Sequence, residues 1–181
     1  MALQSTPYKV EVNLSDMDRN DYDTLRFTMA RHPSETHERL AVRLLSRILW
    51  NAPDIEFGRG LSNVDEPAVW VKSLDGRVLH WIEVGLPDHD RLVWCSRRAE
   101  QVSVFAYGVN KAWLSKVVEN ARDIKNLSIL CLDSAALAPI TEQMTRSINW
   151  TVMLSEGTFF ITDEHAQHTV ELEWLIGERE N

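Results

Sequence analysis

The chain has 181 residues, of which 44% are hydrophobic and 25% are charged, so one hydrophobic core can form without disulfides or bound metal. Its formal net charge is −8 at pH 7, which excludes broad, nonspecific attraction to nucleic acid but leaves room for a local basic patch. We therefore expect a single domain over residues 1–181.

The first part of the chain predicts a β-hairpin and then a helix. Apolar residues alternate with polar ones over residues 8–14 and again over residues 25–29, and a polar run from Ser15 to Asp21 separates the two segments. Ser34 is placed to cap a helix, because apolar residues then recur at three- and four-residue spacing until near Pro53.

The middle of the chain predicts strands that alternate with helices. Strands over residues 68–73 and 77–84 are joined by Asp75-Gly76, the dipeptide favoured in a two-residue hairpin turn. The pattern then predicts a helix from residue 88 to about 101, a strand over 102–107, a helix from 110 to about 124 and a strand over 127–132. This alternation indicates a mixed sheet that is covered on both faces.

The last forty residues return to the strand pattern. Strands are expected over residues 148–155, 158–162 and 169–176, the first two joined across Glu156-Gly157. The predicted fold class is therefore α/β, or α+β in detail. A mixed central sheet is flanked by helices, and extra hairpins lie near both termini.

Two further features of the sequence indicate the cellular compartment of the protein. Cys95 and Cys131 lie in apolar stretches and lack metal-ligand spacing, so neither a disulfide framework nor a structural zinc site is expected. The first residues do not form a basic region followed by an apolar block, and no stretch has the length needed to span a bilayer. We therefore expect a cytoplasmic protein without a membrane partner.

The hairpin turn at Asp75-Gly76 decides which side chains face each other. With a two-residue loop, Trp70 faces Trp81 and Ala68 faces Glu83. One face then carries Glu66, Ala68, Trp70, Lys72, Leu79, Trp81, Glu83 and Gly85, and the other carries Val69, Val71, Val78, His80, Ile82 and Val84.

Glu83 is the first candidate for a functional residue. It lies in the middle of a strand among hydrophobic residues, where a carboxylate is costly to bury unless it is paired, protonated or bound to a cation. The alternative is a structural ion pair with an arginine from a neighbouring helix.

Two more glutamates extend this candidate site. Glu66 lies diagonally across from Glu83, within reach of a shared divalent ion, since oxygen ligands on a firm sheet edge suit magnesium. Glu38, near the start of the predicted helix, could add a third carboxylate by leaning over the sheet. Its alternative role is that of a solvated acid in the first helical turn, where the helix dipole favours negative charge.

Three sequence blocks carry a family resemblance. They are RHPSET at residues 31–36, DEP at 65–67 and WIEVGLPD at 81–88. Together they resemble the signature of the YaeQ family of bacterial proteins, and the likeness runs the whole chain. The resemblance implies a compact variant of the PD-(D/E)XK nuclease fold, without naming a reaction.

The resemblance also implies a magnesium site for phosphodiester hydrolysis, from which this sequence departs twice. The superfamily sets an aspartate after a proline opposite the acidic residue of a (D/E)-x-K strand. Here Ala68 stands in place of the aspartate and Gly85 in place of the lysine. Glu66 could replace the missing carboxylate, and Lys72 or Arg91 the missing cation. A degenerate site is the alternative.

A basic stripe offers a separate candidate. Arg39, Arg43 and Arg47 recur every four residues, so they either follow a phosphate backbone, with Arg97 and Arg98 nearby, or form a solvated helix face. The sequence lacks the motifs of a zinc site, a covalent nucleophile or a phosphate loop, so a nucleotide cofactor is not predicted.

Two hypotheses about function follow. In the first, the protein binds or acts on nucleic acid through Glu38, Glu66 and Glu83 with magnesium, and any enzymatic activity is that of a metal-dependent phosphodiesterase. In the second, it is a non-catalytic interaction module on the same fold, whose acidic surface and exposed aromatic residues engage a protein partner.

Overall fold

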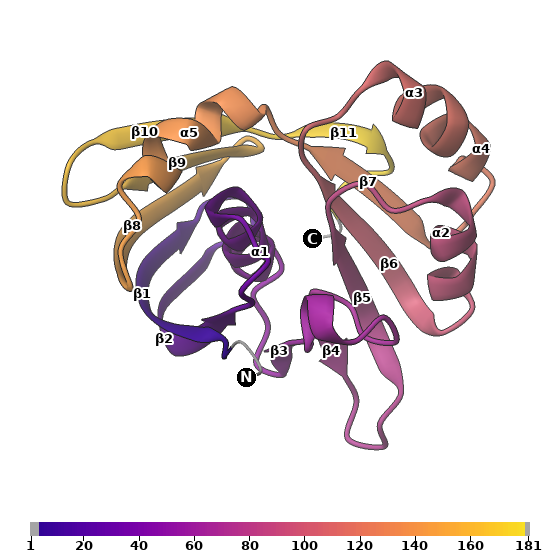
Figure 1. The fold of residues 1–181 in the computed structure, drawn as a ribbon, viewed down its shortest axis with the longest axis horizontal. Helices are drawn as coiled ribbons and strands as arrows, with labels where there is room; N and C mark the ends of the chain where they lie inside the picture. The colour runs from indigo at the N-terminus through magenta and orange to yellow at the C-terminus, as the bar shows by residue number, and fades with distance from the viewer. Residues whose placement is uncertain (1–3, 180–181) are drawn as a thin grey trace. The chain divides into compact units, whose positions relative to one another are not determined.

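Two units, each with its own sheet, make up the mixed α/β fold of the computed structural model, which describes residues 4–179 (Figure 1). The first unit holds residues 4–41 and 132–172, and the second holds residues 42–131 and 173–179. Helix α1 (His37–Leu49) contributes residues to both units, since the division falls between Ala41 and Val42.

The first unit contains a five-stranded sheet in the order β10-β9-β8-β1-β2. Its elements are β1 (Thr6–Asp16), β2 (Asp21–Arg31), α5 (Ser134–Glu142), β8 (Ser147–Ser155), β9 (Thr158–Thr162) and β10 (Gln167–Glu171). Strands β1 and β8 are parallel, and the other neighbours are antiparallel. Alternate residues of β1, such as Val10 and Val12, are buried because successive side chains of a strand point to opposite faces.

The second unit contains a six-stranded sheet in the order β11-β7-β6-β5-β4-β3. Its strands are β3 (Ile55–Phe57), β4 (Val69–Lys72), β5 (Val78–Val84), β6 (Ala99–Ala106), β7 (Leu127–Cys131) and β11 (Glu173–Ile176). Its helical segments are η1 (Gly60–Ser62), α2 (His89–Ser96), α3 (Lys111–Trp113), the π-helical η2 (Leu114–Val118) and α4 (Glu119–Ala121). Strands β5, β6 and β7 are parallel neighbours.

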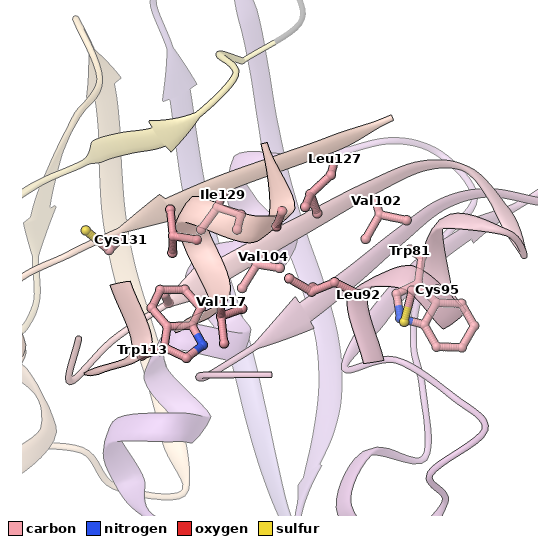
Figure 2. Packing of buried hydrophobic residues seen from close by; sticks show 13 residues of the cluster. Trp81, Leu92, Cys95, Val102, Val104, Trp113, Val117, Leu127, Ile129 and Cys131 are labelled. Carbon is pink, nitrogen blue, oxygen red and sulfur yellow. The ribbon is translucent and has the colours of Figure 1, made fainter. Parts of the chain in front are cut away.

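A hydrophobic core lies between this second sheet and its helices (Figure 2). Leu92 and Cys95 of α2 pack with strand residues such as Trp81, Val104 and Ile129. All five residues of β7 are buried, as expected for an inner parallel strand with both faces covered. Helix α2 is thereby fixed over the strand that carries Glu83.

A chain of polar side chains is also buried in the second unit. His80 Nε2 lies 2.7 Å from the hydroxyl of Ser103, which lies 2.8 Å from the hydroxyl of Ser128. The ring of Trp50 meets the His80 ring edge-on, with centroids 5.4 Å apart. Burial lowers the pKa of His80 to about 4, so the imidazole is neutral at pH 7.

Most of the predicted elements are confirmed, and the departures concern helix ends, strand pairing and short elements. The helix expected to reach residue 101 ends at Ser96, because residues 99–101 already pair with β5 in strand β6. The strand expected over 169–176 is two strands that belong to different sheets. The short strand β3 and helix α5, which contains Pro139, were missed. The expected central sheet is joined by a second sheet, because the two predicted terminal hairpins pair through β1 and β8.

The central hairpin has a longer turn than predicted. Trp70 does face Trp81, but the loop spans Leu74, Asp75 and Gly76, because the N–H of Ser73 donates to the carbonyl of Arg77. Gly76 has a φ of 86°, as in a turn that ends in a bulge. The bulge shifts the register after Val71 and turns Val78 toward Trp81, so the prediction that Val78 shares a face with His80 was wrong.

Helix α1 begins later than predicted. Its first residue is His37, and the hydroxyl of Thr36 accepts a hydrogen bond from the N–H of Arg39 at 3.1 Å. Ser34, the predicted cap, lies outside the helix and bonds to the ring of His32 instead. Glu38 is therefore in the first helical turn. Across residues 4–179, every helix is too short or too polar to cross a bilayer.

Candidate functional site

Glu83 of β5 has its carboxylate paired within the second unit. Its Oε1 accepts hydrogen bonds from the indole Nε1 of Trp81 at 2.7 Å and from Arg91 at 3.0 Å (Nε) and 2.8 Å (Nη2). Trp81 reaches it because residues two apart in a strand share a face. The contacts of the carboxylate with Trp81 and Arg91 therefore all fall on one oxygen, Oε1.

Arg91 occupies the first turn of α2 and is the centre of this site. Asp88 caps the helix by accepting the N–H of Arg91 at 2.7 Å, which fixes where the side chain begins. The guanidinium carbon lies 5.4 Å from the ring centroid of Trp81 and 4.8 Å from that of Trp94. Such contacts favour a cation, so Arg91 has two aromatic rings and a carboxylate to hold its charge.

Arg91 also reaches the segment before β4. Its Nη1 donates to the carbonyl of Val64, and its Nη2 lies 3.5 Å from the carbonyl of Glu66. Arg91 therefore contacts the carboxylate of Glu83 and the backbone carbonyl of Glu66, but not the Glu66 carboxylate.

The carboxylate of Glu66 is held by a different arginine. It accepts the N–H of Arg59 at 2.7 Å and the Nε of the same residue at 2.8 Å. These bonds hold the pKa of Glu66 below its ordinary value. The Glu66 side chain is 14% exposed, whereas that of Arg59 is 73% exposed, so water weakens the ion pair.

A magnesium ion does not fit these side chains as they stand. Oxygen ligands are needed in number, whereas Glu83 and Glu66 each have an arginine as a partner. Within residues 4–179, His, Cys, Asp and Glu side chains do not form a group of three that could hold a metal. The magnesium site stays a prediction.

Glu38 lies in the first unit, in the opening turn of α1. Its Oε1 is buried and lacks a hydrogen-bond partner in the part of the chain that the structure describes. A buried acceptor left unpaired costs about 1–3 kcal/mol. Glu38 as a whole is half-exposed in the first helical turn, so both predicted roles, a third carboxylate of the site and a solvated first-turn acid, stay predictions.

Lys72 is placed apart from the other candidates. Lys72 is the last residue of β4, whereas Ala68, which was predicted to face Glu83, comes just before that strand. Four residues of strand separate Lys72 from Ala68 by about 13 Å. Its Nζ lies 3.2 Å from Glu56 and 4.4 Å from the ring centroid of Trp70. Arg91, and not Lys72, is the cation beside Glu83.

The two departures from the nuclease pattern have structural counterparts. Ala68 is 3% exposed and its carbonyl accepts the N–H of Gly58, so an aspartate at this position would be buried. Gly85 has a φ of 109°, a conformation that a lysine rarely adopts. The structure at these two positions therefore favours alanine and glycine and disfavours the aspartate and lysine of the nuclease pattern.

Trp94, Arg59 and Cys95 also belong to the site and were missed from the sequence. Trp94 was recognisable in principle, since it follows Arg91 by three residues and shares its helix face. Arg59 had no signal, because its bond to Glu66 depends on the path of a loop. Burial raises the pKa of Cys95 to about 12, with the Glu83 carboxylate adding to the effect, so its thiol is unreactive at pH 7.

The basic stripe is not a continuous surface. Arg39 pairs with Glu35 at 2.6 Å. Arg43 is 4% exposed, with its guanidinium carbon 5.2 Å from the ring centroid of Phe57. A buried arginine in the middle of the stripe excludes both predicted roles for the stripe as a whole, a phosphate track and a solvated face.

The chain is similar over nearly its whole length to proteins of one family. The model of the YaeQ protein family matches residues 1–172. The YaeQ protein of Salmonella typhi is 36% identical over 175 residues, which cover 96% of both chains. The crystal structure of the YaeQ protein from Pseudomonas syringae has 54% identity and a TM-score of 0.94, covering 97% of this chain and 98% of that one. The structure from Xanthomonas axonopodis pv. citri has 34% identity and a TM-score of 0.92, covering 96% and 99%. The chain belongs to the YaeQ protein family.

Proposed function

We propose that this YaeQ-family protein works in the cytoplasm as a non-catalytic interaction module that engages a protein partner through its second unit. One observation carries the proposal. Glu83, on which a catalytic role depends, is neutralised by Arg91 and held by the indole of Trp81. This is the structural ion pair with a helix arginine that was the alternative to a functional carboxylate.

The chemistry at the other two nuclease positions supports the same proposal. Hydrolysis of a phosphodiester by this type of site uses carboxylates that hold a metal ion and a cation that stabilises developing charge. Ala68 cannot bind a cation, and Gly85 cannot supply one. Arg91 is the nearest replacement cation, but it already binds Glu83 at 2.8 Å.

The test is a magnesium and manganese titration by calorimetry, with a nucleic-acid cleavage assay on the same samples. The wild type is compared with Glu83→Gln, which keeps the shape of the side chain and removes its charge. Glu119→Gln, a change in an exposed pair with Arg122, is the matched control. We expect neither binding at millimolar metal nor cleavage. Saturable binding lost in Glu83→Gln and kept in Glu119→Gln would contradict the proposal.

A magnesium-dependent nuclease that acts through Glu38, Glu66 and Glu83 is the second candidate. The observation that favours it is that the contacts of the Glu83 carboxylate with Trp81 and Arg91 all fall on Oε1, which leaves Oε2 for a ligand. In this proposal the mixed sheet of the second unit is the compact PD-(D/E)XK variant, and the single domain extends over residues 1–181. The calorimetry described above separates the two candidates, since only the second requires metal binding at Glu83.

A further inference from the structure

We infer that the partner docks on the surface around Arg91, and that it presents a basic segment with apolar anchor residues. The inference rests on the proposed function and adds to it the place and chemistry of the contact. We call this area the Arg91 surface. It consists of Leu61, Val64, Asp65, Leu86, Asp88 and Asp90.

Three large apolar side chains are exposed at the Arg91 surface. Val64 is 78% exposed, Leu61 46% and Leu86 36%. Arg91 links the segments that carry them, since its guanidinium bonds to the carbonyl of Val64 and its N–H bonds to Asp88, two residues after Leu86. Apolar side chains exposed on a surface lose unfavourable contact with water when a partner covers them.

The loop that carries Leu61 and Val64 is held in one shape. Arg59 and Glu66 close it through a backbone and a side-chain hydrogen bond. Gly58 allows the close approach at its base, since a Cβ there would lie 2.0 Å from the carbonyl oxygen of Pro67. A loop ordered before binding loses little conformational freedom when it binds.

The charge left at this surface is negative. Glu83 balances Arg91 and Glu66 balances Arg59. Asp65, Asp88 and Asp90 are exposed around the apolar side chains. Arg98, which lies over the ring of Trp94 beside Arg91, offsets one of the three aspartates that remain. Complementary charge steers a partner and selects its sign, so lysines or arginines should surround the apolar residues of the segment that binds here.

The experiment uses two synthetic fourteen-residue peptides with leucines at the same positions, one with lysines and the other with glutamates between them. Each is titrated into the ¹⁵N-labelled full chain at low and at physiological salt. We expect the lysine peptide to shift the backbone amides of residues 59–66 and 86–91, and the glutamate peptide to leave them unchanged. Leu61→Ser/Val64→Ser should weaken binding about tenfold or more, since the peptide then loses the apolar surface that both side chains offer it.

Two results would overturn the inference. The first is equal binding by Leu61→Ser/Val64→Ser and by the control Leu74→Ser, which removes the exposed leucine at the β4–β5 turn. The second is a shift pattern confined to the first unit, where residues 4–41 and 132–172 carry 13 acidic and six basic residues and attract any basic peptide. Leu61, Val64 and Leu74 are exposed, so their replacement should not disturb the fold. Amide signals of the variants that match those of the wild type outside the changed loops verify this. Failure of the proposed function would instead appear as metal binding and cleavage that depend on Glu83.

Discussion

Removing the charge of Arg91 should destabilise the protein through Glu83. Arg91→Met keeps much of the side-chain stem. The Glu83 carboxylate is then left with two donors, the indole of Trp81 and, at 3.7 Å, the weakly donating thiol of Cys95. Breaking a buried ion pair costs about 3–5 kcal/mol. The side chains of Glu83 and Arg91 are 14% and 24% exposed, so partial hydration should reduce this to about 2–3 kcal/mol.

Urea unfolding followed by tryptophan fluorescence measures this change, since Trp81 and Trp94 lie against Arg91. Adding Glu83→Gln to Arg91→Met should recover at least about 1 kcal/mol, because the unpaired charge is then gone. Arg77→Met is the control, an exposed arginine whose loss should cost less than about 1 kcal/mol. Stability of Arg91→Met within about 0.5 kcal/mol of the wild type, or strict additivity in the double variant, would refute the assigned role of the pair.

Three further predictions concern the fold around the site. Burial lowers the pKa of His80 to about 4 in the folded chain, against the ordinary value of 6.5 in the unfolded chain, so only the unfolded chain gains a proton between these two pH values. The free energy of unfolding should therefore keep the contribution of His80 above pH 6.5 and fall by about 3 kcal/mol as the pH drops to 4. In His80→Gln, the urea midpoint measured between pH 6.5 and pH 4 should fall much less. Thr36→Ala should cost about 1 kcal/mol by loss of the α1 cap, whereas Ser34→Ala, outside the helix, should leave the thermal midpoint nearly unchanged. Gly85→Lys should lower stability by about 1–3 kcal/mol through backbone strain, and a nuclease assay should find that the restored lysine brings no activity.

The strand and helix pattern was predictable where burial and periodicity agree. Alternation along β1 and the apolar repeat of α1 were sufficient, because each reflects one buried face. The prediction of one strand over residues 169–176 was wrong, because the alternation continues across Leu172 while the pairing partner changes from β9 to β7. Periodicity records which residues are buried and says nothing of the sheet that buries them.

The position of Glu83 on its strand was predictable, whereas the partners of its carboxylate were not. The pairing of Trp70 with Trp81 and the position of Glu83 followed from the hairpin, and the bulge near the turn did not disturb them because the register recovers by Val71. The partners of Glu83 and Glu66 required the paths of α2 and of the loop at Arg59. Those paths are set by tertiary packing, which local pattern does not contain.

The order of the chain has a consequence for folding during synthesis. Strand β11, at residues 173–176, forms the edge of a sheet whose other strands lie within residues 55–131. The first unit likewise joins residues 4–41 to residues 132–172. Neither sheet can be completed on the ribosome until the last strands have emerged, and until then the fully buried β7 has an open edge that other chains can pair with. The chain is therefore open to edge-to-edge pairing in the interval between the synthesis of β7 and that of β11.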